Sequence, residues 1–340
     1  MSNKQETIFI TGATGFLGSY ILRYLVKQGY NDIRALRRPD SPMNLVEPVK
    51  DKVEWITGDL LDHFLLEGAM QGVDKVYHAA ALVSHERKDR DAMRRINAEG
   101  TATVVNAALY SGIKKFLHIS SIAAIGRNRS RQHIDENNKW ERSPFNSNYA
   151  ISKYLAEQEV WRAGAEGLNI AILNPSIILG SGFWDRGTAR LFRQLSAGMR
   201  FYPVGASAYV DVRDVARMAI QLMESDIEEE RIIASAVNLS YRQLFSQIAP
   251  LLGKKPPSIR VNPRLAQVAA IPLSLWASLT GRRSALSRET ALMTSCHFTY
   301  GHQKSKQLLD FEYLPFQQSL EEICEQFLKE GQGEASFLPI

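Results

Sequence analysis

Short apolar runs that alternate with longer helical stretches constrain this chain more than any other feature of its sequence. The runs are rich in Ile, Val, Phe and Leu, and the stretches between them have helical spacing and stop at glycines such as Gly29 and Gly112. Buried strands that alternate with helices predict an α/β fold with a doubly wound parallel sheet, covered on both faces. The predicted strands are 7–11, 32–36, 53–56, 75–79, 115–119 and 169–173, and the predicted helices are 16–28, 92–111 and 149–163.

This alternation weakens beyond Pro175, which indicates a second, smaller lobe. Helices are predicted over 188–198 and 212–223, the latter with Asp211 as its N-cap, and the sequence from Tyr241 onward is mostly helical in character. The apolar stretch 265–279 is broken by Pro272 and is shorter than the ~20 residues that a bilayer span needs. It predicts a buried or amphipathic helix. We expect a main domain over 1–180, to which 208–240 return, and a lobe over 181–207 and 241–340.

A glycine-rich turn joins the first predicted strand to the first predicted helix. The sequence there is TGATGFLG, residues 11–18, so the glycines follow a G-x-x-G-x-x-G pattern. Glycines at this junction allow a tight turn and a close approach of the backbone to a pyrophosphate, and the helix start offers free N–H groups. The main domain is therefore expected to be a Rossmann-type dinucleotide-binding domain. The residues expected to contact the cofactor at this turn are Gly12, Thr14, Gly15, Phe16, Leu17 and Gly18.

The end of the second strand should decide between NADP and NAD. A carboxylate there would hold the adenosine 2′-hydroxyl of NAD, whereas an arginine would hold the 2′-phosphate of NADP. Arg37 and Arg38 stand at this point and favour NADP, while the nearby Asp40 keeps NAD open.

Two further strand ends are candidates for cofactor contact. Asp59 and Leu60 follow the third strand, where a carboxylate could reach the adenine amine, although a helix cap leading into 61–70 is an equal alternative. The fourth strand ends in small residues that would let the backbone approach a flat cofactor, or that only pack tightly. These residues are Ala79, Ala80 and Ala81.

The strongest chemical signal is the pair Tyr149 and Lys153. Residues four apart share one face of a helix, so the phenol and the ammonium would lie side by side. Because an unperturbed tyrosine titrates near pH ~10, it needs a nearby cation to act as an acid and base at neutral pH. The fifth strand ends in Ser120 and Ser121, and a hydroxyl there could polarise a carbonyl together with Tyr149. Both serines could instead bond only to nearby backbone.

Composition argues against several other classes. The net charge is +5, but the basic residues lie in small groups and not in one stripe with interleaved aromatics, so no nucleic-acid partner is expected. The histidines lack HExxH spacing and no G-x-S-x-G occurs, which argues against a metal site and a serine hydrolase. Cys296 and Cys324 form no CxxC, and the N-terminus has no secretory pattern, so we expect a cytoplasmic protein without a stable membrane span.

Taken together, these motifs resemble those of the extended short-chain dehydrogenases/reductases, also called the NAD-dependent epimerase/dehydratase family. The similarity extends to HAAA at 78–81, NAEGT at 97–101, HISSIAAIG at 118–126, NPS at 174–176 and the segment 300–322. It implies that Tyr149 is the general acid/base, that Lys153 is its electrostatic partner and binds the nicotinamide ribose, and that Ser121 polarises the carbonyl. It also implies a small-molecule substrate and further cofactor contacts at Asn97, Ser120, Pro175, Ser176 and Ile178.

Within that family, two kinds of enzyme compete. Residues 33–38 and 174–180 look more like those of dihydroflavonol-4-reductase-like and 3β-hydroxysteroid-dehydrogenase-like members, which act on a carbonyl or alcohol of a hydrophobic substrate. A nucleotide-sugar epimerase or dehydratase with tightly bound NAD is the alternative, and Arg186, Arg190 and Arg193 could hold its diphosphate. A non-catalytic NADP-binding regulator is a further alternative, although such a protein would tend to lose Tyr149 or Lys153. The Tyr149 helix is a candidate homodimer surface, because helices of such sheets often pair.

Overall fold

The computed structural model describes residues 5–128, 132–185, 187–265, 267, 288–331 and 337–340, and its core is a seven-stranded parallel sheet. The strand order is β11-β7-β5-β4-β1-β2-β3, and every neighbouring pair runs parallel. Its strands are β1 (Ile8–Thr11), β2 (Ile33–Arg37), β3 (Glu54–Thr57), β4 (Lys75–His78), β5 (Lys115–Ile119), β7 (Ile170–Pro175) and β11 (Glu230–Ala234). Because the strands are parallel, all their carboxyl ends open at one edge of the sheet, where open α/β sheets bind ligands.

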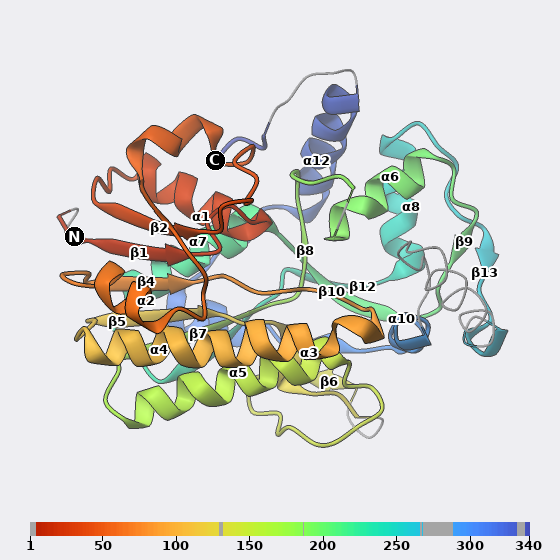
Figure 1. The fold of residues 1–340 in the computed structure, drawn as a ribbon. Helices are drawn as coiled ribbons and strands as arrows, with labels where there is room; N and C mark the ends of the chain where they lie inside the picture. Colours follow the sequence, from red (N-terminus) through yellow and green to blue (C-terminus); the bar gives the residue numbers. More distant parts are fainter. Residues whose placement is uncertain (1–4, 129–131, 186, 266, 268–287, 332–336) are drawn as a thin grey trace.

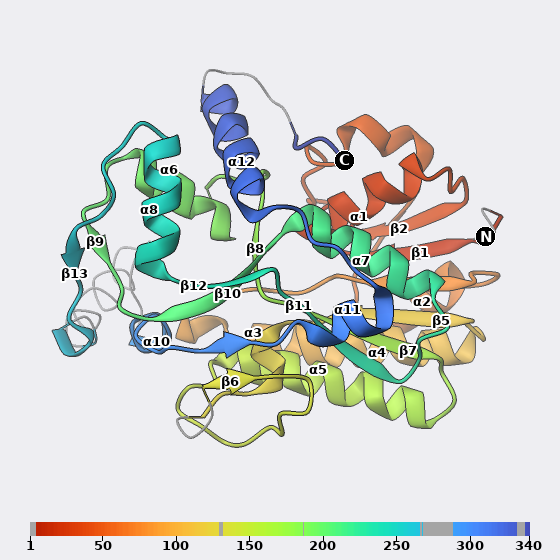
Figure 2. The same cartoon turned by 180° about the vertical axis from the view of Figure 1, so that it is seen from behind.

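Helices cover both faces of this sheet, which confirms the predicted doubly wound α/β class (Figures 1 and 2). One face carries α1 and α7, which pack on each other, and the other carries α2, α4 and α5. The helices of the main domain are α1 (Phe16–Lys27), α2 (His63–Ala69), α3 (Arg90–Met93), α4 (Gly100–Tyr110), α5 (Asn148–Ala165) and α7 (Val212–Glu224). Asp211 caps α7 as predicted, because its side chain accepts a hydrogen bond from the Arg213 N–H at 2.7 Å.

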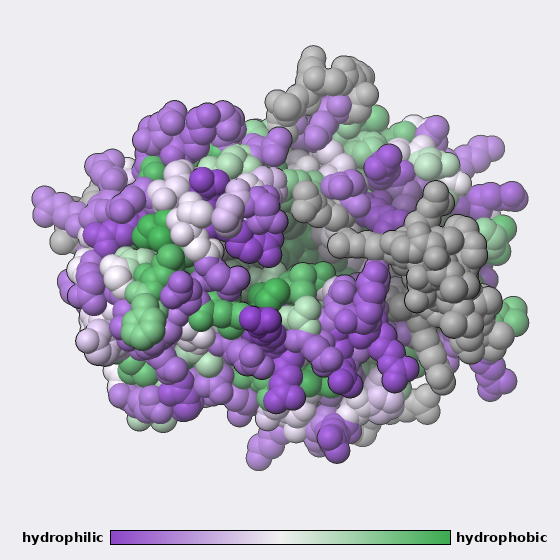
Figure 3. Space-filling view, in the orientation of Figure 1, coloured by the Kyte–Doolittle hydropathy of each residue, from purple (hydrophilic) through white to green (hydrophobic). Residues whose placement is uncertain are grey.

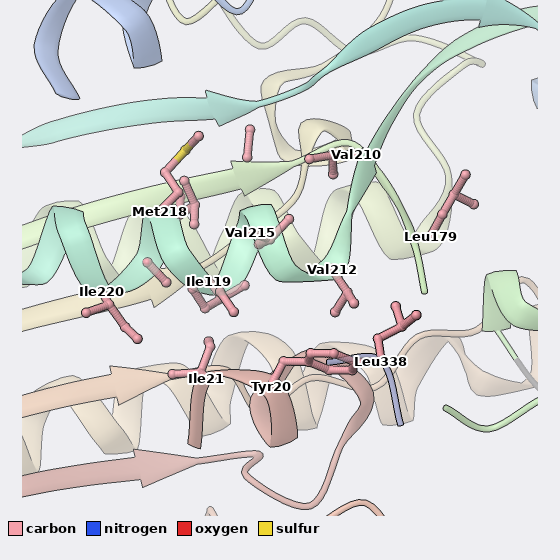
Figure 4. Close-up of a cluster of buried hydrophobic side chains, with 14 of the residues drawn as sticks. Tyr20, Ile21, Ile119, Leu179, Val210, Val212, Val215, Met218, Ile220 and Leu338 are labelled. Atoms are coloured by element: carbon pink, nitrogen blue, oxygen red, sulfur yellow. The ribbon is translucent and has the colours of Figure 1, made fainter. Parts of the chain in front are cut away.

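The hydrophobic core formed by α1 and α7 also includes Leu338, from the last described segment of the chain (Figure 4). Val212 and Ile220 of α7 point toward Tyr20 and Ile21 of α1, and all four are at most 2% exposed. Leu338 packs into the same cluster and is 2% exposed. Full burial of each large apolar side chain contributes roughly 1.5–3 kcal/mol, so this interface holds the β1–α1 unit firmly in place.

The smaller lobe lies beyond the carboxyl edge of the sheet and is largely helical, as expected, but it also contains short strands. Its helices, with those of the tail, are α6 (Arg190–Ser196), α8 (Tyr241–Leu251), α10 (Arg288–Met293), α11 (Gln303–Leu309) and α12 (Phe316–Gly331). Three small sheets, β12-β10-β8, β13-β9 and β14-β6, are formed by β6 (His133–Ile134), β8 (Ile177–Leu179), β9 (Phe201–Tyr202), β10 (Ala206–Asp211), β12 (Val237–Ser240), β13 (Ile259–Arg260) and β14 (Thr299–Tyr300).

Two sequence predictions need correction. The predicted helix 92–111 is not uniform, because α3 passes through a π-helical stretch, Arg94–Glu99, before α4 begins. No strand is predicted between Pro175 and Tyr241, yet this part of the chain supplies β8, β10, β11 and β12. These strands are three to six residues long, and neighbouring strands rather than local patterning define them. The predicted helix over 265–279 lies almost wholly outside the described residues, as does Arg186.

Candidate active site

The glycine turn between β1 and α1 forms a cradle of backbone groups. Gly12 has a φ of +73°, and a Cβ on it would lie 2.6 Å from the backbone nitrogen of Ala80. A Cβ on Gly18 would overlap the carbonyl oxygen of Gly12, so neither position admits a side chain. No side chain caps α1 and its first turn holds no acidic residue. The N–H groups and the positive end of this helix therefore suit an anion.

The other residues predicted at this turn lie around the same cradle. Thr14 is buried, Gly15 donates its N–H to the Gly12 carbonyl at 2.9 Å, and Leu17 is partly buried. The ring of Phe16 packs against the backbone of Gly180. Phe16 therefore joins the turn to the segment that follows β8.

Arg37 is the last residue of β2 and Arg38 follows it, next to the glycine turn, because Leu36 is in register with Thr11 of β1. Arg37 is partly buried, and its Nε has no hydrogen-bond partner among the described residues. Arg38 is exposed and lies 3.6 Å from Asp40, whose side chain is 81% exposed. An ion pair this exposed contributes little free energy, so the guanidinium groups of Arg37 and Arg38 can both bind another anion.

Asp59 and Leu60 follow β3, and the helix-cap alternative for Asp59 is wrong. The cap of α2 is Asp62, whose carboxylate accepts from the Leu65 N–H at 3.1 Å. Asp59 instead accepts from the Leu61 N–H at 2.9 Å in a turn of its own. Leu60 packs over Gly100 at the start of α4.

The end of β4 is held by buried polar contacts. His78 is fully buried, with Nδ1 2.7 Å from the Thr11 hydroxyl and Nε2 2.9 Å from the Thr101 hydroxyl. Burial lowers the pKa of His78 to about 3, so it is neutral. Ala79 and Ala80 are partly buried beside Gly12, and Ala81 is exposed.

Asn97, which lies in the π-helical stretch, uses its side chain to join two elements. Its Oδ1 accepts from the Leu82 N–H at 2.7 Å, and its Nδ2 donates to the Leu82 carbonyl and to the Ser152 hydroxyl, both at 2.9 Å. It thereby ties the loop after β4 to α5, one residue before Lys153. A π-helical stretch inside an α-helix, such as the one that contains Asn97, often occurs at a functional site.

Tyr149 and Ser121 face each other across the carboxyl end of β5. Tyr149 lies in the first turn of α5, which Ser147 caps by accepting from the Ala150 N–H at 3.0 Å. Burial raises the pKa of the Tyr149 phenol, and its hydrogen bond with Ser121 partly opposes that rise. Ser121 also caps the short turn Ile122–Ile125 through the Ala123 N–H. Its hydroxyl thus serves both the local backbone and Tyr149.

Lys153 lies one turn further along α5 and is 1% exposed. Its ammonium donates to Nε2 of His118 at 3.1 Å and to the carbonyl of Ile119 at 2.9 Å. Burial lowers the pKa of Lys153 to about 8, while the negative charge of Glu157 acts in the opposite direction. Burial also lowers the pKa of His118 well below its usual value, so the ring is neutral and Nε2 can accept.

A buried network that sequence reasoning missed supports this pair. Glu157 is fully buried one turn after Lys153, and its carboxylate accepts from the Asn174 amide at 2.6 Å and pairs with Arg231 at 2.9 Å. The same Asn174 amide donates to the backbone carbonyl of Ser121 at 2.9 Å. The spacing of four between Lys153 and Glu157 was the one signal in the sequence that could have indicated it.

Residues at the end of β7 complete the carboxyl edge. Pro175 is the last residue of β7, Ser176 donates its N–H to the Ala234 carbonyl at 2.9 Å, and Ile178 lies in β8. The buried hydroxyls of Ser120 and Ser176 have no hydrogen-bond partner among the described residues. Since buried polar groups normally have partners, these hydroxyls fit a polar ligand at this edge. With the glycine cradle, the residues present are compatible with a dinucleotide.

The lobe closes over the start of α5. Figure 3 shows the surface hollowed between the sheet domain and the lobe, with apolar side chains inside the hollow. Glu289 of α10 accepts from the backbone N–H of Asn148 at 2.6 Å, next to Tyr149. Arg127 donates from Nε to the Tyr300 hydroxyl at 2.6 Å, so the loop after β5 contacts β14. The described part of the chain contains no cluster of potential metal ligands and no helix that could span a membrane.

Comparison with known proteins agrees with this geometry. The model of the NAD dependent epimerase/dehydratase family matches residues 8–234. A putative dihydroflavonol 4-reductase from Synechocystis sp. is 31% identical over 337 residues, which cover 96% of each protein. Sterol demethylase protein B from Methylococcus capsulatus is 31% identical over 271 residues, covering 78% of this chain and 80% of that protein.

Solved structures agree on the fold. The crystal structure of gox2253 gives a TM-score of 0.82 at 28% identity and covers 96% of this chain and 99% of that one. DesIV, a dTDP-glucose 4,6-dehydratase from Streptomyces venezuelae with NAD and TYD bound, gives a TM-score of 0.77 at 19% identity over 96% and 98%. The chain therefore belongs to the NAD-dependent epimerase/dehydratase family, the extended branch of the NAD(P)-binding short-chain dehydrogenases/reductases.

Proposed function

We propose that this chain is an NAD(P)-dependent oxidoreductase that interconverts a carbonyl and an alcohol on a hydrophobic small molecule. One observation carries the proposal: Ser121, Tyr149 and Lys153 lie together at the carboxyl edge of the sheet, the edge that also holds the glycine turn. The sequence similarity to proteins named as reductases supports oxidation and reduction as the net reaction.

In the direction of reduction, Tyr149 gives its phenolic proton to the substrate oxygen. Ser121 donates a hydrogen bond to the same oxygen, so that two donors stabilise the negative charge that develops there. The nicotinamide, when bound, supplies the hydride. The raised pKa of Tyr149 in the protein alone keeps the phenol protonated at neutral pH, ready to act as an acid.

Lys153 has two tasks in this mechanism. Its charge favours the phenolate that Tyr149 becomes on giving up the proton. An ammonium has three N–H groups, and His118 and Ile119 accept from two of them, so the third can bond a hydroxyl of the nicotinamide ribose. With a pKa of about 8, most of the lysine carries its charge at neutral pH.

The end of β2 supports NADP as the preferred cofactor. Arg37 and Arg38 stand beside the glycine turn, and Asp40 forms only a long, exposed ion pair with Arg38. Two guanidinium groups suit a 2′-phosphate better than they suit a neutral ribose hydroxyl. Asn97, Ser120, Ser176 and the other predicted contacts remain part of the proposed cofactor site.

A nucleotide-sugar epimerase or dehydratase is the competing function. Several solved structures with that activity in their titles share the fold, but at or below 21% identity they speak for the fold alone. Arg190 and Arg193 are exposed, and no ion pair to a described carboxylate engages them. They remain the residues that could hold the diphosphate of such a substrate.

A deuteride-transfer assay separates these functions. Purified protein is incubated with 4-deuterated NADPH or NADH and a panel of aromatic, steroid and aliphatic carbonyls or of nucleotide sugars, and the product and its deuterium are measured by mass spectrometry. The proposal expects one deuteron per product and matching oxidation of NADPH. Turnover of nucleotide sugars with no net change in cofactor would refute it in favour of the epimerase. Bound NADP(H) without transfer to any carbonyl would favour a regulator.

A further inference from the structure

The lobe has a charge distribution unlike that of the rest of the chain. The whole sequence contains 36 Asp and Glu residues, yet none occurs between residues 186 and 210 or between 231 and 288. Both stretches contain arginine or lysine throughout. Residues 211–230 between them, which include α7 of the main domain, carry several acids. The positive excess of the protein is therefore concentrated in the lobe.

The cations of the outer rim of the lobe are exposed. They lie on two adjacent segments, 197–203 and 253–265, which backbone hydrogen bonds join at β9 and β13. Within the described residues, none of these cations forms an ion pair with a carboxylate. The rim cations are Arg200, Lys254, Lys255, Arg260 and Arg264.

Large apolar side chains are exposed on the same rim. Phe201 is 55% exposed, Ile259 39% and Leu265 68%. Phe201 and Ile259 are partners in the parallel register of β9 and β13, so their side chains leave the same face of the strand pair. In Figure 3 isolated apolar patches lie among hydrophilic ones along the right-hand edge, where Figure 1 has these two strands. We call this set of cations and apolar side chains the lobe rim.

We propose that the lobe rim docks on the surface of an anionic lipid bilayer. Cations near such a surface are attracted by the phosphates and acidic headgroups, and apolar side chains between them can enter the boundary between headgroups and acyl chains. This combination matches the rim, whose cations lack counter-ions in the described structure. The proposal does not depend on which reaction the active site catalyses.

A nucleic acid fits the rim less well than a bilayer does. Proteins that bind single strands present several aromatic rings on which bases stack, whereas Phe201 is the only aromatic among the three exposed apolar side chains. Ile259 and Leu265 offer no such stacking surface. The rim also lies at the end of the molecule opposite β1, β2 and β3, so docking there leaves the cofactor edge of the sheet uncovered (Figures 1 and 2).

The test is co-sedimentation of the full-length protein with vesicles of phosphatidylcholine, alone or with one third phosphatidylglycerol. The wild type should bind only the anionic vesicles, and binding should fall steeply at the salt concentration that shortens the Debye length to about 3 Å. Each cation near the bilayer surface should increase the partition coefficient of the protein onto anionic vesicles about fivefold. The partition coefficient of the variant Arg200→Glu/Lys254→Glu/Arg260→Glu should therefore be lower than that of the wild type by about a hundredfold or more.

Matched control variants distinguish vesicle binding by the lobe rim from attraction by the net charge of the whole protein. Lys52→Glu/Lys139→Glu/Lys306→Glu makes the same charge change at exposed lysines outside the rim and should stay within about threefold of the wild type. Phe201→Ser/Ile259→Ser keeps every charge and should lose about tenfold or more, because insertion of the apolar side chains is removed. All these side chains are exposed, so thermal unfolding should confirm intact folding.

Three outcomes would overturn the proposal. The first is a wild type that does not bind anionic vesicles at low salt. The second is a control variant that loses as much binding as the rim variant, which would assign binding to net charge. The third is binding of single-stranded RNA as tight as vesicle binding, with no effect of Phe201→Ser/Ile259→Ser on either, which would indicate a general polyanion surface.

Discussion

Burial of Lys153 should make the stability of the folded protein depend on pH in a direction opposite to that of a lysine paired with a carboxylate. Its pKa falls from 10.5 in a solvated chain to about 8 in the folded protein, because the ammonium is 1% exposed and loses its water. The unfolded chain therefore holds this proton more tightly than the native state does. Below pH 8 the charged lysine destabilises the fold, and stability rises as pH increases from 8 toward 10.5.

The size of the effect follows from the two pKa values. A fall from 10.5 to about 8 corresponds to about 3 kcal/mol of destabilisation at neutral pH, because each pH unit is worth about 1.4 kcal/mol. Between pH 7.5 and pH 9.5, about 2 kcal/mol of this should be recovered. Lys153→Met removes the titrating group, so its free energy of unfolding should lack this recovery. The loss of the contacts to His118 and Ile119 affects the variant nearly equally at both pH values.

The assay is urea unfolding of both proteins at pH 7.5 and at pH 9.5, followed by tryptophan fluorescence. The difference between wild type and variant cancels the titration of the remaining groups, including buried Lys115, whose pKa burial also lowers to about 8. Lys139→Met, at an exposed position, serves as the control and should track the wild type at both pH values. If the gap between wild type and Lys153→Met were the same at both values, the lysine would be as solvated as in the unfolded chain, and the reasoning would be wrong.

Three further predictions concern the reaction, the cofactor and the stability of the glycine turn. Tyr149→Phe should keep the Kd for the cofactor within about threefold and lower kcat by about 10²–10⁴, measured by NADPH oxidation; a kcat close to that of the wild type would remove the acid/base assignment. Arg37→Ala/Arg38→Ala should raise the Kd for NADPH about tenfold or more and leave that for NADH nearly unchanged, measured by fluorescence titration; equal changes would contradict the phosphate role. Gly18→Ala should lower stability by about 2 kcal/mol or more in thermal unfolding, because its methyl group would overlap the Gly12 carbonyl; a wild-type Tm would show that the turn can open.

Much of the main domain could be predicted because its signals are local. The run TIFIT and the glycine turn directly after it specify β1, the backbone cradle and the start of α1 at Phe16. The spacing of Tyr149 and Lys153 places both on one helix face wherever that helix lies. In these cases the physical cause, apolar patterning or a glycine that admits no side chain, acts over a few residues.

The parts that escaped prediction depend on partners distant in sequence. β11 is a strand because its residues pair with β7, about sixty positions earlier in the chain. The contact between Lys153 and His118 joins α5 to β5, and Glu157 meets Asn174 and Arg231 only after the sheet has formed. Apart from the spacing of four between Lys153 and Glu157, nothing in the local sequence distinguishes these polar residues from solvated ones. Asn97 in the π-helical stretch likewise bonds to Leu82 and to Ser152, which lie 15 and 55 positions away in the chain.

The order of strands in the main sheet places the residues proposed to select the coenzyme and those proposed to move the proton at the ends of different strands. β1 and β4 stand between β2, which ends at Arg37, and β5, which leads to Ser121. Under the proposed roles, the group that selects the coenzyme and the groups that move the proton are two strands apart and share no direct contact. Descendants of one ancestral chain could exchange one coenzyme for the other through surface substitutions after β2, while the acid–base apparatus and its buried supports stay untouched.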